Sequence, residues 1–193
     1  MGAALRLVAE RGFEAATVGA IEAEAGLAPR SGALYQYFAG KDDVLRCAIE
    51  RELEVLDELG SVIEMLPLGD LRAELTLMAR WNLSSLRRRS DLTGLLQREA
   101  RQLPADLLEE IYVRIVARPY DQVVAWLRGR LPADSDADVY TLALVLIESM
   151  ASYNAIQQTF GRTPDDIDDE RFIAGWAEIA LAVANRYGLS DRS

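Results

Sequence analysis

The sequence predicts an all-α protein of about nine helices. Apolar residues recur at three- and four-residue spacing in each long segment, which is the helical period. Capping residues stand before these segments, and glycine or proline stands after them. No segment shows the alternation of a strand, an internal repeat or a low-complexity tract. These observations favour a helical chain with short connections.

The composition is that of a globular chain. Of its 193 residues, 50% are hydrophobic, which is ample for a core. The sequence has no run of about 18 apolar residues and no basic-then-apolar leader, so we expect neither membrane insertion nor export. The single cysteine, Cys47, excludes an internal disulfide framework and fits the cytoplasm; its simplest interpretation is a small buried hydrophobe on a helix.

The net charge of −10 is unfavourable for binding a polyanion, so its distribution matters. Residues 1–47 hold five bases and six acids and therefore carry a net charge of only −1. Most of the negative charge lies in the rest of the chain. A nearly neutral N-terminal part on an acidic remainder is compatible with DNA binding by the N-terminal part alone.

Residues 1–38 predict three short helices. A first helix over residues 1–11 places Leu5 and Val8 on one face and ends at Gly12. Thr17 caps a second helix, and Gly26 supplies its left-handed end. The apolar face of this second helix consists of Val18, Ile21 and Ala25.

A third helix follows a sharp turn. Pro29 suits its first turn, and Leu34 and Phe38, four residues apart, point inward. Its outward residues are Arg30, Ser31, Tyr35, Gln36 and Tyr37. A helix, a glycine turn and a polar-aromatic helix make a helix-turn-helix, in which the second helix lies in the major groove of DNA.

Six short words in this quarter of the chain match one known family in order and spacing. They are Gly12-Phe13-Glu14, Thr17-Val18, Ala25-Gly26, Leu34-Tyr35, Tyr37-Phe38, and Lys41 followed by Asp42-Asp43-Val44-Leu45. The sequence resembles the tetracycline-repressor (TetR) family of bacterial transcription regulators. One departure is that seven residues, Leu27 to Ala33, stand where the commonest family pattern has five. The recognition helix therefore begins at Pro29 or at Ser31, and this choice changes the residues that face the bases.

The resemblance implies a DNA-binding domain in residues 1–47, with its motif at about 17–38, and a ligand-binding and dimerisation domain in residues 48–193. It implies a homodimer that binds a palindromic double-stranded DNA operator and a small-molecule effector. The residues expected at DNA are Thr17, Arg30, Ser31, Gly32, Tyr35, Gln36, Tyr37 and Lys41. Among these, Tyr35, Tyr37 and Lys41 are expected at phosphates, and Arg30, Ser31, Gly32 and Gln36 near base edges.

The remaining segments predict long helices. One runs from Lys41 to about Leu66, and Asp70 caps the next, which ends at the arginines 87–89. These arginines either complement a helix C-terminus or approach DNA phosphates. A shorter helix covers residues 91–102. A further helix follows Pro104 and is expected to kink or break near Arg118, because Pro119 removes a backbone donor.

Two final helices cover residues 136–160 and 168–188. The acids Asp134, Asp136 and Asp138 resemble a calcium loop, but the loop's glycine and glutamate positions hold Val139 and Val145, so helix capping is the better interpretation. The family builds its dimer interface from its last two helices. The residues expected there are Leu142, Leu146, Met150, Phe172, Trp176, Ile179 and Val183.

Catalysis has little support in this sequence. The chain has no histidine, no pair of cysteines, no phosphate-binding loop and no Gly-x-Ser-x-Gly elbow, so we expect neither an enzyme, a metal site nor a cofactor. The family resemblance implies an effector site between the middle helices, and the aromatic and polar residues there suggest a mostly apolar or aromatic molecule. Its candidate residues are Trp81, Asn82, Gln97, Arg101, Tyr112, Tyr120, Tyr153, Asn154 and Gln157. The sequence therefore predicts a ligand-responsive repressor; the alternative is a helical ligand-carrier or interaction module with little DNA affinity.

Overall fold

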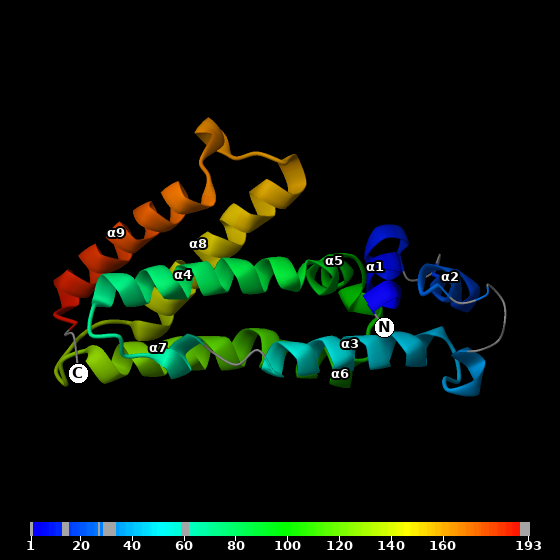
Figure 1. Cartoon of the computed structure of the whole chain (residues 1–193). Helices are drawn as coiled ribbons and strands as arrows, with labels where there is room; N and C mark the ends of the chain where they lie inside the picture. The colour runs from blue at the N-terminus through cyan, green and yellow to red at the C-terminus, as the bar shows by residue number, and fades with distance from the viewer. Residues whose placement is uncertain (1, 13–15, 27, 29–33, 59–61, 190–193) are drawn as a thin grey trace. The chain divides into compact units, whose positions relative to one another are not determined.

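The computed structural model of the chain describes residues 2–12, 16–26, 28, 34–58 and 62–189 (Figure 1). These residues form α-helices joined by short turns and contain no strand, so the predicted all-α fold is confirmed. The helices are α1 Gly2–Arg11, α2 Val18–Glu24, α3 Lys41–Glu58, α4 Leu71–Arg88, α5 Ser90–Glu99, α6 Ala105–Tyr112, α7 Arg118–Arg130, α8 Val139–Phe160 and α9 Asp169–Tyr187.

The chain divides into two compact units. The head unit comprises Met1–Leu59 with Arg88–Ile115, and the body unit comprises Gly60–Arg87 with Val116–Ser193. The head unit thus contains α5 and α6 besides the first three helices. The division at residue 47 that the family resemblance implies remains a prediction.

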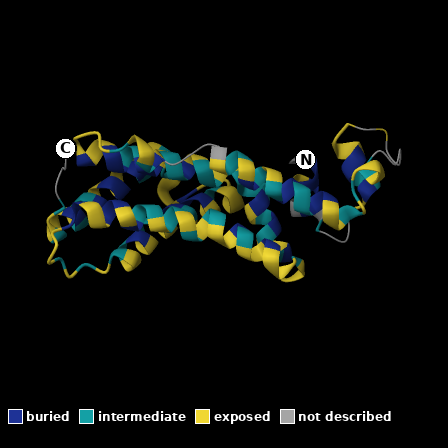
Figure 2. Ribbon diagram, turned by 90° about the horizontal axis from the view of Figure 1, so that it is seen from below, coloured by how far each residue is buried: buried dark blue, intermediate teal, exposed yellow. Residues whose placement is uncertain are grey.

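The core of the head unit is formed by α1, α2, α3, α5 and α6. Leu5 and Val8 of α1 pack with Ile49 of α3 and with Leu92 and Leu95 of α5, all fully buried. Figure 2 shows such buried positions alternating with exposed ones along the helices. The C-terminal end of α1 is also held by a hydrogen bond, since Arg98 Nη1 of α5 donates to the Glu10 carbonyl at 2.8 Å.

The helix-turn-helix begins as predicted. Thr17 caps α2, because its hydroxyl oxygen accepts the Ala20 N–H at 3.2 Å. Gly26 has a φ of +74°, the left-handed conformation that glycine adopts without strain. One residue differs from expectation, because Ala25 is exposed. Glu22, a carboxylate, is buried on this helix instead.

The second helix of the motif differs from the prediction. Pro29 and the rest of residues 29–33 lie outside the described residues, and from Leu34 the backbone forms a 3-10 turn, Leu34–Gln36 (η1), rather than an α-helix through Phe38. The turn ends because the chain reverses into α3, where the Asp43 carboxylate accepts the Ala39 N–H at 3.2 Å. Leu34 and Phe38 do pack against the head core, as predicted.

The connection from α3 to α4 contains less helix than predicted. Helix α3 ends at Glu58, residues 59–61 lie outside the described residues, and a 3-10 turn, Val62–Met65 (η2), follows in place of a helix to Leu66. Asp70 caps α4 as predicted, since its Oδ1 accepts the N–H of Arg72 at 2.9 Å. Cys47 lies half-buried on α3.

The break predicted near Arg118 is confirmed. Helix α6 ends at Tyr112, a π-helical segment covers Val113–Ala117 (η4), and α7 begins at Arg118 with Pro119 in its first turn. Proline has no N–H and its ring pushes on the carbonyl four residues earlier, so a wider π turn accommodates it. The carbonyl of Ile115 in this segment accepts a hydrogen bond from Arg89 Nη1 at 3.4 Å.

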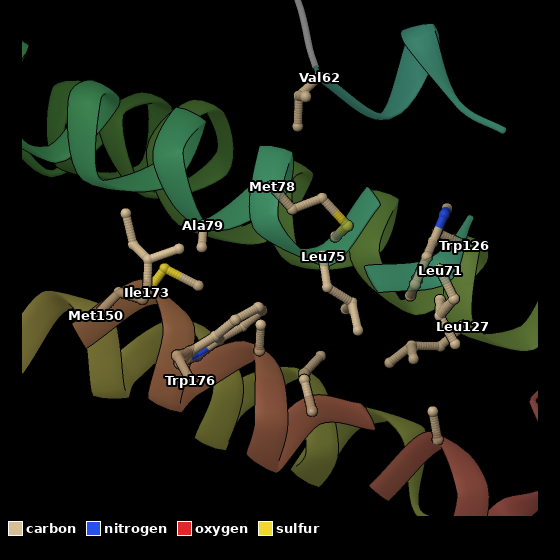
Figure 3. Packing of buried hydrophobic residues seen from close by; sticks show 14 of the residues in the cluster. Val62, Leu71, Leu75, Met78, Ala79, Trp126, Leu127, Met150, Ile173 and Trp176 are labelled. Carbon is tan, nitrogen blue, oxygen red and sulfur yellow. The ribbon is translucent and has the colours of Figure 1, made fainter. Parts of the chain in front are cut away.

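The body core lies between α4, α7, α8 and α9. Figure 3 shows Met150, Ile173 and Trp176 turned toward the helix that carries Leu75 and Ala79. Helix capping is confirmed at the acidic stretches. Asp138 accepts the Thr141 N–H at 3.2 Å at the start of α8, and Asp168 accepts the Arg171 N–H at 2.8 Å at the start of α9.

One buried ion pair stabilises the body. Glu74 of α4 accepts a hydrogen bond from Arg130 Nη2 of α7 at 2.5 Å, and both side chains are buried. The second oxygen of Glu74 accepts the Leu68 N–H at 2.7 Å. The Arg130 guanidinium stacks over the Trp126 ring at 4.3 Å. Such a pair tolerates burial because its hydrogen bonds offset the lost hydration.

A second polar cluster links the C-terminal half of α8 and the first residue of α9 to α4. The Tyr153 hydroxyl lies 3.0 Å from Asp169 Oδ1 and accepts from the Gln157 amide at 2.7 Å. Arg87 Nη2 donates to Asp169 Oδ1 at 2.7 Å, which holds the pKa of that carboxyl below its usual range. Burial, followed by the contact with Asp169, raises the pKa of Tyr153 to about 12.

This cluster predicts a pH dependence. A tyrosine whose folded-state pKa is raised favours folding while it stays neutral, so its contribution is complete below about pH 10 and is lost as the pH rises through about 12. We therefore expect the stability difference between the parent chain and Tyr153→Phe to shrink over that range in urea unfolding. Tyr140→Phe, at an exposed tyrosine of α8, is the control. A parent-to-Phe difference that stays constant with pH would contradict the assignment.

Candidate functional site

The exposed edge of the head is aromatic and polar. Tyr35 and Tyr37 are 63% and 78% exposed, and Gln36 between them is also exposed. Large aromatic side chains that stand in solvent have no packing role, so they are available to a partner. Arg30, Ser31 and Gly32, the residues expected near the bases, lie outside the described residues.

The other two expected DNA contacts are fixed by helix ends. Thr17 caps α2, and its hydroxyl oxygen is engaged by the Ala20 N–H. Lys41 is the first residue of α3 and is half-buried. Since α3 also supplies Ile49 and Leu53 to the head core, the position of Lys41 is tied to the packing of the whole unit.

The structure divides the expected effector residues between the two units. Gln97, Arg101 and Tyr112 belong to the head unit and are exposed, so they are not grouped with the others. They are exposed because other faces of these helices pack in the core. Leu92 and Leu95 of α5 and Leu107 and Ile111 of α6 face that core.

Six expected effector residues lie in the body unit, and most already have partners. Tyr153 and Gln157 are engaged with Asp169, and the Tyr120 hydroxyl donates to Glu148. Trp81 is partly buried and packs against the body core. The amide oxygens of Asn82 and Asn154 are buried without a hydrogen-bond partner. A buried acceptor without a donor costs free energy, which a ligand carrying an N–H or O–H group could recover.

An apolar cavity lies in the body between α4, α7, α8 and α9. Its volume is about 20 Å³, enough for a single water-sized molecule. Ligand pockets for drug-sized molecules are typically about 300–1,000 Å³, so an effector would have to enlarge it. The lining residues are Leu71, Leu75, Trp126, Leu127, Leu131, Leu142, Leu146, Ala180, Val183, Ala184 and Leu189. Leu142, Leu146 and Val183 thus face this cavity, although they were expected at a dimer interface.

Of the residues expected at a dimer interface, two are buried, four are half-buried and one is exposed. Met150 and Trp176 are only 2% and 6% exposed, and Trp176 Nε1 donates to the Leu146 carbonyl at 3.0 Å. Phe172 stacks on Tyr153 with ring centroids 3.9 Å apart. Met150 and Trp176 therefore belong to the body core, and Phe172 is half-buried against it. Ile179, at 64% exposed, is the expected residue that does face solvent.

A second apolar face of α8 escaped the sequence analysis. Leu144, Val145, Ile156 and Phe160 are all exposed. Among the described helices, α8 is the one that is long and apolar enough to cross a membrane by length and composition, and only 22% of its most apolar window is buried. The signal was present in the sequence, because α8 carries apolar residues on nearly all sides rather than in one stripe.

Comparisons with known proteins agree with this geometry. Residues 1–47 match the family described as bacterial regulatory proteins, tetR family. The fatty acid degradation regulator FadR from Bacillus halodurans has a similar structure, with a TM-score of 0.64 at 18% identity over 92% of this chain and 90% of that chain. A comparison with curated protein sequences found no match.

Two further solved structures share the fold. A bacterial regulatory protein of the tetR family from Rhodococcus RHA1 matches with a TM-score of 0.63 at 18% identity, over 94% of this chain and 92% of that chain. AibR, solved with isovaleryl coenzyme A and operator DNA, matches with a TM-score of 0.61 at 20% identity, over 92% and 93% of the two chains. The chain therefore shares the fold of these solved structures, and its residues 1–47 match the tetR family of bacterial regulatory proteins.

Proposed function

We propose that this chain is a cytoplasmic, homodimeric transcriptional repressor that binds a palindromic operator and is released by a small, mostly apolar or aromatic effector. The match of residues 1–47 to the tetR family carries the proposal. The exposed edge Tyr35-Gln36-Tyr37, next to Lys41, supports it, because aromatic hydroxyls and a lysine suit phosphate contacts. The helical carrier or interaction module with little DNA affinity is the alternative, and salt-dependent operator binding distinguishes the two.

A second copy is the proposed partner of the outer face of α8 and α9. That face exposes Leu144, Val145, Ile156, Phe160 and Ile179. An apolar surface of this kind costs about 25 cal/mol for each Å² left in water, and a two-fold dimer buries the same patch on both subunits. The dimer would hold two heads at a spacing that fits successive major grooves.

The effector is proposed to bind in the body. The apolar lining of the small cavity and the unpartnered amide oxygens of Asn82 and Asn154 favour an apolar molecule with a hydrogen-bond donor. Two of the structural neighbours are a fatty acid degradation regulator and AibR solved with isovaleryl coenzyme A, and both fatty acids and the isovaleryl group are apolar acyl chains. Release from DNA then requires that the effector bind the enlarged body more tightly than the closed one.

The first functional prediction separates phosphate contacts from base contacts. Lys41→Ala should weaken binding to all duplexes alike and flatten the salt dependence by about one unit, because one phosphate contact is lost. Arg30→Ala should cost about 1–3 kcal/mol and relax sequence preference. Titration of specific and random duplexes at several salt concentrations measures both effects. A Lys41→Ala protein with a changed operator preference would contradict this division.

The second prediction concerns the dimer. Ile179→Glu should yield a folded monomer in sedimentation velocity, because it places a charge in the apolar face. Asn185→Glu is the matched control; it is exposed on the same helix, about 120° further around its axis. Trp176→Glu should instead destabilise the body, since Trp176 is buried. A monomeric parent, or a dimer that Ile179→Glu leaves intact, would refute the assignment.

The third prediction tests the coupling of the two ligands. Operator DNA should weaken effector affinity by the factor by which effector weakens operator affinity, typically about 5- to 150-fold. Effector binding should change tryptophan fluorescence, and Trp81→Phe should remove most of that change. If Trp126→Phe removes it instead, the effector occupies the apolar cavity that Trp126 lines. Equal effector affinities with and without operator would mean that the bound molecule does not control DNA release.

A further inference from the structure

Glu22 is a carboxylate buried in the head. It lies on α2 and is only 1% exposed, among the most completely buried large side chains described. Its Oε1 accepts the backbone N–H of Leu34 at 3.3 Å, across twelve residues of sequence. Removing a carboxylate from water is costly unless hydrogen bonds replace its hydration. The hydrogen bond between Glu22 and Leu34 is therefore a structural requirement of burying Glu22.

Leu34 is the first residue of the turn that presents the exposed aromatic edge. Its carbonyl accepts the N–H of Tyr37 at 3.0 Å and the N–H of Phe38 at 2.9 Å, which closes η1. Its own N–H donates a hydrogen bond to Glu22 Oε1. Both backbone polar groups of Leu34 are therefore engaged, and the partner of its N–H comes from α2.

The helix that carries Glu22 is itself fixed in the head. Thr17 caps its start, and Val18 and Ile21 are buried on its inner face. A hydrogen bond from this helix to Leu34 therefore sets the position of the aromatic edge relative to the head core. Glu24, two residues further on, has no such role, since it is exposed and lies 3.9 Å from the Arg6 guanidinium.

We propose that Glu22 is a positioning residue for DNA recognition, which holds the segment carrying Tyr35, Gln36 and Tyr37 in the register that sequence-specific binding requires. The inference rests on the proposed DNA-binding function and deepens it. Glu22 acts through the Leu34 amide and does not itself touch DNA. A purely electrostatic account predicts the opposite effect, namely that replacing an acidic residue of the head by an uncharged one tightens DNA binding.

The test compares four proteins on two duplexes. The parent, Glu22→Gln, Glu22→Met and Glu24→Met are titrated with a duplex enriched from a random library by the parent, and with a scrambled duplex of equal length. Glu22→Gln keeps an acceptor oxygen, whereas Glu22→Met fills the space without one. Glu24→Met removes the same charge from the same helix at an exposed site.

We expect Glu22→Met to lose at least about tenfold in the ratio of specific to scrambled affinity, since a hydrogen bond to a charged group is lost. Glu22→Gln should restore most of that ratio, and Glu24→Met should leave it unchanged. The proposal is overturned if Glu22→Met keeps the parent ratio, or if Glu22→Met and Glu24→Met raise both affinities equally.

Amide hydrogen exchange at Leu34 supplies a measurement that needs no DNA. The Leu34 amide should be protected in the parent and in Glu22→Gln and exposed to exchange in Glu22→Met, while the amides of α3 keep their protection as a control for folding. An unprotected Leu34 amide in the parent overturns the proposal. A parent that enriches no duplex, but protects Leu34, contradicts the proposed DNA-binding function and leaves the contact of Glu22 intact.

Discussion

The cost of burying a carboxylate is the constraint on which the connections of this fold depend. Helices satisfy most of their own backbone groups, whereas turns leave N–H groups that need partners from elsewhere. Glu22 accepts the Leu34 N–H at the start of η1, and Glu74 accepts the Leu68 N–H in the connection before α4. Both carboxylates are buried on helices. Each therefore fixes the path of a non-helical segment relative to a packed core.

The end of α1 is held in a related way. Arg98 of α5 donates a hydrogen bond to the Glu10 carbonyl. The neighbouring Glu99 is buried, and a β-carbon added to Gly12 would lie 3.1 Å from Glu99 Oε1. Glycine suits this position because of its φ of +82°, and a side chain there would also crowd Glu99. Helix α5 is consequently part of the head unit.

Local features of this fold were predictable from the sequence, and tertiary ones were less so. Caps at Thr17, Asp70 and Asp138 and the break at Pro119 were predicted because each depends on residues within one turn. The burial of Glu22 was not, because a glutamate within a helix ordinarily indicates a solvent-facing position. Its signal was indirect, since it adjoins the inward-facing Ile21. Met150 was expected at a dimer interface and is buried in the body core, because apolar residues surround α8 and do not distinguish its inner side from its outer side.

The two apolar sides of α8 connect the proposed dimer to the proposed effector site. Leu142 and Leu146 line the small cavity of about 20 Å³, whereas Leu144 and Val145 on the same two turns are exposed on the outside. A packed core yields by moving whole elements rather than by deforming continuously. A molecule that enlarges the cavity would displace one or more of the helices that line it, among them α8, whose other side is proposed to contact the second subunit. In a dimer that forms through that face, effector binding in the body and a change in the separation of the two heads would result from the same helix displacement.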